Sequence, residues 1–139
     1  MIVCVDASLA LKWLTRESGS DEALAWLGAH AEDGFIAPAF FPIEVASVLK
    51  QKARRNEIAI EECFEALRLL DKLKVRLTWD QALLERAFEL AVELDQPTVY
   101  DTAYLALAER EQCEFWTADV SFTRAASVSY PLVRSLTQG

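Results

Sequence analysis

The sequence predicts an α/β fold, a three-layer α/β/α sandwich around a central parallel sheet of about five strands. Short apolar runs alternate with helical patterns from one end of the chain to the other, which is typical of a parallel sheet covered by helices on both faces. The runs are uninterrupted, as in Ile2-Val3-Cys4-Val5, and this pattern indicates strands that are buried on both sides. With 139 residues, the chain predicts a single domain over residues 1–139.

The apolar runs place the strands, and the amphipathic segments between them place the helices. Strands are expected at residues 2–5, 35–37, 75–78, 115–117 and 132–134. Helices are expected at residues 8–14, 21–31, 42–55, 60–73, 81–94, 101–112 and 122–126.

Local signals support several of these helices. Pro42 marks a helix start, because proline suits the first helical position, and Asp80 is expected to cap the helix at 81–94. Helical spacing predicts two apolar faces. The first face comprises Leu24, Leu27 and Ala31, and the second Phe64, Leu67, Leu70 and Leu73.

Composition narrows the function. A formal charge of -8 and a pI of about 4.7 argue against broad electrostatic binding of nucleic acid, although a local basic face remains possible. Hydrophobic residues make up 53% of the chain, so we expect an apolar partner surface or a dimer interface. Cys4, Cys63 and Cys113 lie within or beside expected elements and predict reduced thiols. With no signal peptide and no membrane-spanning stretch, the expected location is the cytoplasm, away from membranes.

Four acidic residues stand near the expected ends of strands and starts of helices. Asp6 and Asp119 follow apolar strands, Glu44 lies in the first turn of the helix after strand 35–37, and Asp101 opens a later helix. Parallel sheets bind ligands outside the carboxyl ends of their strands, so these side chains are expected to meet there. A carboxylate cluster without histidine or cysteine predicts a hard cation, Mg²⁺ or Mn²⁺.

Helix capping is an alternative for three of these residues. Asp6, Asp101 and Asp119 each stand where an aspartate commonly caps a helix. Glu44 fits this explanation less well, because the capping-box position three residues earlier is Phe41 and its neighbours are apolar. Capping explains each aspartate singly better than it explains the set of four.

Several motifs together resemble those of PIN-domain ribonucleases, especially VapC-type toxins of toxin-antitoxin modules. The motifs are Met1-Ile2-Val3-Cys4-Val5-Asp6-Ala7-Ser8-Leu9-Ala10-Leu11-Lys12-Trp13, Pro42-Ile43-Glu44-Val45, Tyr100-Asp101-Thr102-Ala103-Tyr104-Leu105-Ala106-Leu107-Ala108 and Thr117-Ala118-Asp119. Each is unspecific alone, but their order, spacing and strand-end placement run from the first residue to about the last strand. The resemblance implies a PIN-like fold and a metal-dependent endoribonuclease that cleaves RNA, is inhibited by a cognate antitoxin and works as a homodimer.

The resemblance also implies roles for individual residues. Asp6, Glu44, Asp101 and Asp119 would be the catalytic acidic quartet that binds Mg²⁺ or Mn²⁺. Ser8 and Thr117 match hydroxyls that support the site through hydrogen bonds, although a cap or turn role is equally compatible with their positions. Many relatives carry a further acid after the T-x-D aspartate, where this chain has Val120-Ser121-Phe122. A second metal ion is therefore expected to be held weakly or to arrive with the substrate.

Basic residues near the acidic motifs are candidates for phosphate contacts. Lys12 is the preferred supporting residue, and Arg16 follows it. The cluster Lys50, Lys52, Arg54 and Arg55 ends a helix, where basic side chains also favour the helix dipole.

Two other classes of function compete with the nuclease. A receiver domain or phosphatase on a similar sheet would carry paired acids or D-x-D after the first strand, where this chain has Asp6-Ala7-Ser8. A catalytically silent binding module would keep the fold, but the intact quartet argues against it.

Overall fold

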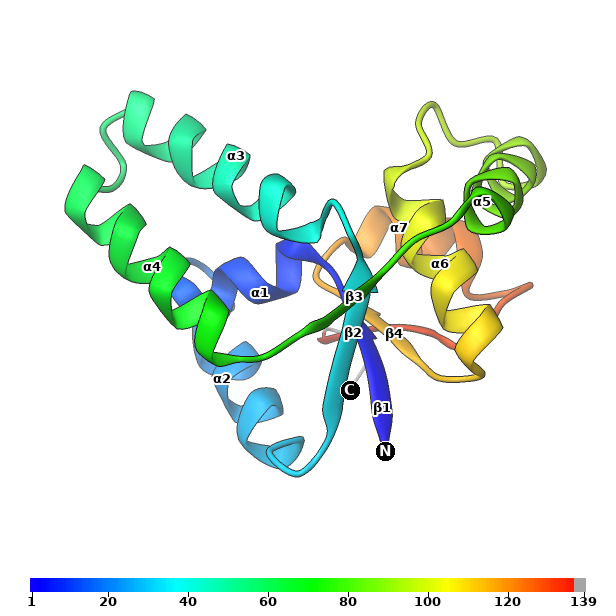
Figure 1. The fold of residues 1–139 in the computed structure, drawn as a ribbon, viewed down its shortest axis with the longest axis horizontal. Helices are drawn as coiled ribbons and strands as arrows, with labels where there is room; N and C mark the ends of the chain where they lie inside the picture. The colour runs from blue at the N-terminus through cyan, green and yellow to red at the C-terminus, as the bar shows by residue number, and fades with distance from the viewer. Residues whose placement is uncertain (137–139) are drawn as a thin grey trace.

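A parallel sheet in the order β3-β2-β1-β4-β5 organises residues 1–136, the part of the chain that the computed structural model describes (Figure 1). The strands are β1 (Ile2–Val5), β2 (Gly34–Pro38), β3 (Arg76–Thr78), β4 (Phe115–Thr117) and β5 (Val133–Ser135). Within β1, Cys4 lies opposite Ile36 of β2 and Phe115 of β4. The predicted parallel sheet is confirmed, and the last three residues of the domain predicted over 1–139 lie outside the described residues.

Helices cover both faces of this sheet. They are α1 (Ala7–Leu14), α2 (Ser20–Ala29), α3 (Phe41–Arg54), α4 (Ile60–Lys72), α5 (Gln81–Glu93), α6 (Tyr100–Glu111) and α7 (Val120–Ala126). Figure 1 shows α1 to α4 on one side of the sheet and α5 to α7 on the other. The predicted three layers are therefore present, and the predicted element bounds agree with the observed ones to within two residues.

Alternation along β1 divides the core between the two sides. Val3 and Val5 pack in one apolar cluster with Trp26 of α2, whereas Cys4 packs in another with Leu105 of α6. Successive strand residues point to opposite faces, so a strand that is apolar at every position supplies both layers. The predicted reduced thiols are free: Cys4 and Cys63 are buried and Cys113 is partly exposed.

The predicted apolar face of α2 is only partly correct, because Leu27 packs against the core but its two companions do not. Ala23 and Trp26 are buried, whereas Leu24 is 44% exposed and Ala31 lies beyond the helix end. The Trp26 ring stacks on Trp13 with a centroid distance of 5.8 Å, so an aromatic contact accompanies the burial of this face.

The predicted face of α4 is only partly correct. Leu70 is buried, but Phe64 is 54% exposed, and Cys63 and Ala66 take the inner positions. The Cys63 thiol donates to the carbonyl of Leu49 in α3 over 3.6 Å. These small side chains allow the two helices to pack closely.

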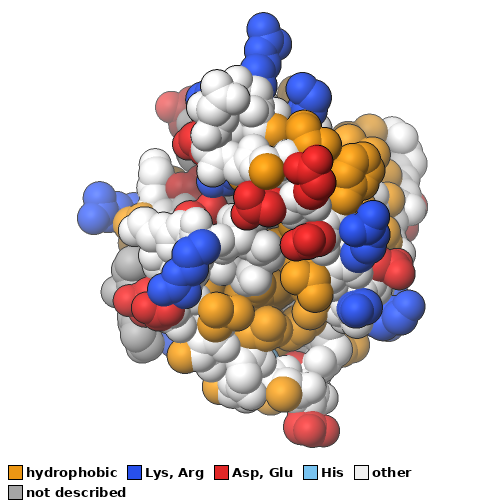
Figure 2. All heavy atoms as spheres, turned by 90° about the vertical axis from the view of Figure 1, so that its left-hand side faces the viewer, with side chains coloured by type: hydrophobic (Ala, Val, Ile, Leu, Met, Phe, Trp, Pro, Cys, Tyr) orange, Lys and Arg blue, Asp and Glu red, His pale blue; other side chains and the backbone are white. Residues whose placement is uncertain are grey.

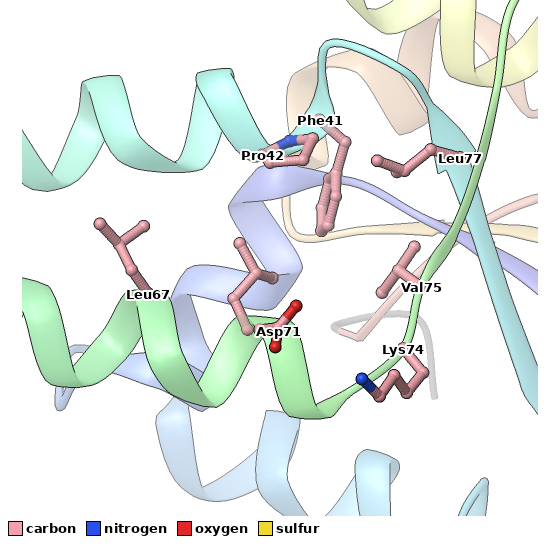
Figure 3. Close-up of a pocket in the computed structure, with 8 residues that line it drawn as sticks. Phe41, Pro42, Leu67, Asp71, Lys74, Val75 and Leu77 are labelled. Carbon is pink, nitrogen blue, oxygen red and sulfur yellow. The ribbon is translucent and has the colours of Figure 1, made fainter.

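Several large apolar side chains are exposed, whereas the partner surface expected from the composition stays a prediction. Leu84, Phe88 and Val92 form a stripe along α5 at a spacing of four residues. Near the start of α3, an apolar groove of about 340 Å³ is lined by Phe41, Val75 and other side chains shown in Figure 3. Figure 2 shows the side of the molecule on which α3 and α4 project, where apolar, acidic and basic side chains lie close together. No helix within residues 1–136 is long and apolar enough to cross a membrane.

Candidate active site

Asp6 stands at the carboxyl end of β1 and is almost fully buried, with 4% of its surface exposed. Its Oδ1 accepts from the Leu9 backbone N–H over 3.0 Å and from the Ser8 hydroxyl over 2.8 Å. Its Oδ2 accepts from the Thr117 hydroxyl over 2.5 Å. Burial raises the pKa of Asp6 to about 6, although the hydrogen bonds favour its charged form.

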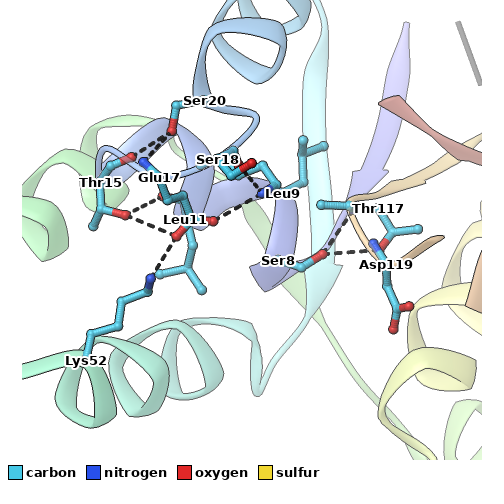
Figure 4. A network of polar contacts seen from close by, with 12 residues as sticks. Ser8, Leu9, Leu11, Thr15, Glu17, Ser18, Ser20, Lys52, Thr117 and Asp119 are labelled. Atoms are coloured by element: carbon cyan, nitrogen blue, oxygen red, sulfur yellow. Dashed lines mark hydrogen bonds and ion pairs between the residues drawn. The ribbon is translucent and has the colours of Figure 1, made fainter. Parts of the chain in front are cut away.

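The hydroxyls of Ser8 and Thr117 join the ends of β1 and β4 (Figure 4). Ser8 Oγ accepts from the Ala118 backbone N–H over 3.0 Å, and Thr117 Oγ1 accepts from the Asp119 N–H over 2.9 Å. Because both hydroxyls also donate to Asp6, they fix the two aspartates relative to each other.

Glu44 and Asp101 approach the same place from the first turns of α3 and α6. Tyr104, one turn after Asp101, donates its hydroxyl to Glu44 Oε1 over 2.7 Å. Burial raises the pKa of Glu44, and this hydrogen bond acts in the opposite direction. The pKa of Asp101 rises to about 7, chiefly through burial and then through the charges of Asp119, Asp6 and Glu44.

All four predicted carboxylates line one pocket of about 510 Å³ at the carboxyl ends of β1 and β4. The connections from these strands leave the sheet on opposite sides, so the pocket occupies a topological switch point. Lys12, Lys52 and Arg55 also line the pocket. Lys50, Arg54 and Arg16 do not, so the basic cluster contributes only part of its predicted charge.

Capping accounts for two of the aspartates but not for the third. Asp6 caps α1, and Asp119 caps α7 by accepting from the Phe122 N–H over 3.0 Å. The capping alternative is wrong for Asp101, because α6 begins at Tyr100 with Val99 at the capping position. The carboxylate of Asp101 makes no hydrogen bond within residues 1–136, and the negative charges of the other three acids repel it.

The chemistry of this donor set fits a hard divalent cation. Carboxylate oxygens are the ligands that Mg²⁺ and Mn²⁺ prefer. Burial and, after it, repulsion from the other acids raise the pKa of Asp101, and a bound cation would offset both effects. As they are placed, the side chains of residues 1–136 include no ready group of three histidine, cysteine or acidic ligands. The fit therefore rests on donor chemistry and uncompensated charge.

Phe122 lies in Val120-Ser121-Phe122, the segment directly after Asp119. Its side chain is buried in the core, with 2% of its surface exposed, and its backbone N–H is held by Asp119. This residue thus has a packing role that a carboxylate could not fulfil without losing core contacts.

Two pocket residues were missed by the sequence reasoning. Tyr104 follows Asp101 by three positions on α6, and this helical spacing would have indicated that both side chains share a face. Glu17 lies in the connection between α1 and α2 and contacts Lys12 and Lys52. No local sequence pattern reveals these contacts.

Comparison with known proteins adds evidence of kinship. The family model of the PIN domain matches residues 3–128. A VapC ribonuclease of Mycobacterium bovis and Ribonuclease VapC9 of Mycobacterium tuberculosis are each 28% identical to this chain over 131 residues. These alignments cover 94% of this chain and 96% of either relative.

Two solved structures share the fold at low sequence identity. PAE2754 from Pyrobaculum aerophilum matches with a TM-score of 0.70 and 18% identity, over 99% of this chain and 94% of that one. A chain of VapBC2 from Rickettsia felis, bound to a DNA fragment from their promoter, matches with a TM-score of 0.71 and 13% identity, over 97% and 98%. With the family model matching most of its length, the chain belongs to the PIN domain family.

Proposed function

We propose that this protein is a metal-dependent endoribonuclease toxin that hydrolyses phosphodiester bonds in RNA and is inhibited by a cognate antitoxin. The observation that carries the proposal is the gathering of Asp6, Glu44, Asp101 and Asp119 in one pocket from four separate elements. Family membership and likeness to VapC ribonucleases along almost the whole chain support it.

The hydrogen bonds of the pocket side chains indicate a different role for each of them. Asp6 and Asp119 are fixed by backbone and hydroxyl donors, so each presents a carboxylate in a set orientation. Mg²⁺ or Mn²⁺ held by the acidic residues would supply a water of lowered pKa and offset charge on the phosphate. Tyr104 holds Oε1 of Glu44 and leaves Oε2 to orient the attacking water or to act as a further ligand. Attack by water leaves a 5'-phosphate and a 3'-hydroxyl.

Protein partners complete the proposal. The exposed stripe on α5 and the groove beside α3 and α4 offer two separate apolar surfaces. We assign such surfaces to the antitoxin and to a second copy of this chain, because exposed apolar patches mark protein contacts. The place of action is the cytoplasm, where RNA and an antitoxin are both available.

Cleavage of total cellular RNA by antitoxin-free protein tests the proposal, with Mg²⁺, Mn²⁺ or EDTA as the variable. Asp101→Asn is the diagnostic variant, because that carboxylate makes no hydrogen bond within residues 1–136 that the change would break. Asp95→Asn is the matched control: Asp95 is exposed, and its left-handed φ of 52° suits asparagine. Metal-dependent products from wild type and the control, lost in Asp101→Asn, would support a nuclease. Undiminished cleavage by Asp101→Asn would contradict the site.

A further inference from the structure

Beyond the acidic site, the pocket contains an ion-pair network that links two helices. Glu17 Oε1 lies 3.3 Å from Lys12 Nζ of α1, and Glu17 Oε2 lies 2.9 Å from Lys52 Nζ of α3. The lysine side chains are each 20% exposed and that of Glu17 is 23% exposed, so the network is shielded but open to the pocket. Figure 4 shows Lys52 reaching from α3 toward Glu17.

The connection between α1 and α2 holds Glu17 in place. Its backbone N–H donates to Ser20 Oγ over 2.9 Å, and the Ser20 hydroxyl donates to the Thr15 carbonyl over 3.1 Å. Lys12 is fixed as well, because its Nζ donates to the Ser18 carbonyl over 2.5 Å. Gly19 has a φ of 85°, and a Cβ there would stand 3.3 Å from Lys12 Nζ. The Lys12 side chain therefore packs closely against Gly19, and the connection between α1 and α2 fixes the position of its ammonium group.

The charge of the side chains that line the pocket changes from negative to positive along α3. Glu44, Val48, Lys52 and Arg55 line it from a single face of the helix. Eight residues separate Glu44 from Lys52, which corresponds to about 12 Å along a helix axis. An RNA strand with its scissile phosphate over the carboxylates would therefore place a phosphate farther along the strand near the two lysines.

We propose that Glu17 is a positioning residue that holds Lys12 and Lys52 as a clamp for a backbone phosphate near the scissile one. This inference rests on the proposed nuclease function and adds a binding subsite to it. Without RNA, the carboxylate of Glu17 keeps both ammonium groups at the pocket wall. When RNA binds, each lysine directs a free N–H toward the phosphate while Glu17 keeps the pair in register.

Two variants that break the same Glu17–Lys52 pair distinguish the clamp from a structural brace. Lys52→Met removes a phosphate contact, so we expect RNA binding to weaken about tenfold and the salt dependence to fall by about 0.7 in logarithmic slope. Glu17→Gln adds a net positive charge to the wall, so binding should tighten about threefold. Cleavage at saturating RNA should nevertheless slow about tenfold, because the lysines lose their fixed positions.

Glu111→Gln is the matched control, since Glu111 pairs with Arg76 over 3.2 Å and does not line this pocket. It changes the net charge equally and should leave affinity and rate unaltered. Affinity is measured by fluorescence anisotropy of a single-stranded RNA at several salt concentrations, in an Asp101→Asn background that prevents cleavage. The rate at saturating RNA is measured in the otherwise wild-type protein, and melting temperatures confirm that each variant is folded.

Opposite changes in affinity for the two variants, with slower cleavage by Glu17→Gln, support the clamp. Changes in the same direction, or an unaltered maximal rate for Glu17→Gln, overturn it. If Glu17→Gln does not fold, Lys52→Met decides alone, because unchanged affinity and salt slope contradict a phosphate contact. Absence of metal-dependent cleavage by wild type would overturn the nuclease itself, whereas the binding measurement judges the clamp separately.

Discussion

The acidic and basic ends of the pocket balance charge in opposite ways. At the acidic end, Asp101 has no basic partner within residues 1–136, and its pKa is raised to about 7 by burial and neighbouring carboxylates. At the basic end, Lys12 and Lys52 share Glu17, which neutralises part of their charge within the protein. A cation from solution would compensate the acidic end under the proposed function, whereas the basic end is already compensated by Glu17 within the protein.

Removing a carboxylate of the acidic end should cause the largest loss of RNA cleavage. We expect Asp101→Asn to lower kcat/KM for RNA by about a thousandfold, because it removes a negative charge that a metal ion would use. Asp6→Asn should lower activity as much, but it also disturbs an aspartate that receives three hydrogen bonds. Steady-state cleavage beside circular dichroism spectra checks both variants, and folded variants with full activity would contradict the assignment.

The pH dependence of stability should reveal the uncompensated charge. Because the folded pKa of Asp101 is about 7 and thus above the ordinary value of 3.8, the folded state binds more protons than the unfolded state between these values. Metal-free protein should therefore lose stability as the pH rises from about 4 to 7. Thermal melts at pH 5 and pH 8 measure this loss.

Asp101→Asn should lose less stability over that pH range and melt above wild type at pH 8 without metal. Mn²⁺ should raise the melting temperature of wild type at pH 8 more than that of the variant, since the ion replaces protons as the compensating charge. A pH profile identical for wild type and Asp101→Asn would show that the charge of Asp101 is compensated in another way.

A smaller loss of activity is expected from a change at Tyr104, whose hydroxyl orients the carboxylate of Glu44. Tyr104→Phe removes the 2.7 Å hydrogen bond but keeps the ring, which stacks on Phe115 with centroids 5.5 Å apart. We expect kcat to fall about tenfold, whereas the free energy of unfolding should change by only about 1 kcal/mol. Single-turnover kinetics and urea unfolding measure the two quantities. A large loss of stability with unchanged kcat would make Tyr104 a packing residue only.

The smallest effect should come from Arg55 at the basic end. Its side chain is 61% exposed and pairs with Glu57 over 2.6 Å, so its contribution is screened by solvent and already partly satisfied. Arg55→Gln should weaken RNA affinity about twofold. Anisotropy titrations at low salt can resolve this change, and a loss as large as that of Lys52→Met would move the main phosphate contact to Arg55.

The strands were easier to predict from the sequence than the buried faces of the helices. Apolar runs located β1 and β2, because a strand covered on both faces must be apolar at successive positions, whereas the edge strands β3 and β5 contain Arg76 and Arg134 and gave a weaker signal. The face of α2 was not predictable in the same way. Ala23 and Trp26 take the inner positions and Leu24 is exposed, because the tryptophan ring finds aromatic partners in other elements, including Trp116 of β4, which is distant in sequence.

In the candidate site, too, some residues could be predicted from local sequence and others could not. Asp6 directly follows β1 and Asp119 follows β4 after one intervening residue, so the pairing of these strands brings them close together. Glu17 depends on the packing of α1 against α3, which joins lysines that are forty residues apart in the sequence. A residue whose role is created by tertiary packing leaves no local pattern for sequence reasoning to find.

Asp6 combines a helix cap, three hydrogen bonds and a place in the acidic pocket, whereas Asp101 has only the last of these within residues 1–136. This difference bears on genetics. In a selection for cells that survive production of the protein without an antitoxin, changes at Asp101 should yield abundant, folded protein. Changes at Asp6 should more often also lower the amount of protein that accumulates. The two positions would then separate loss of toxicity through chemistry from loss through turnover.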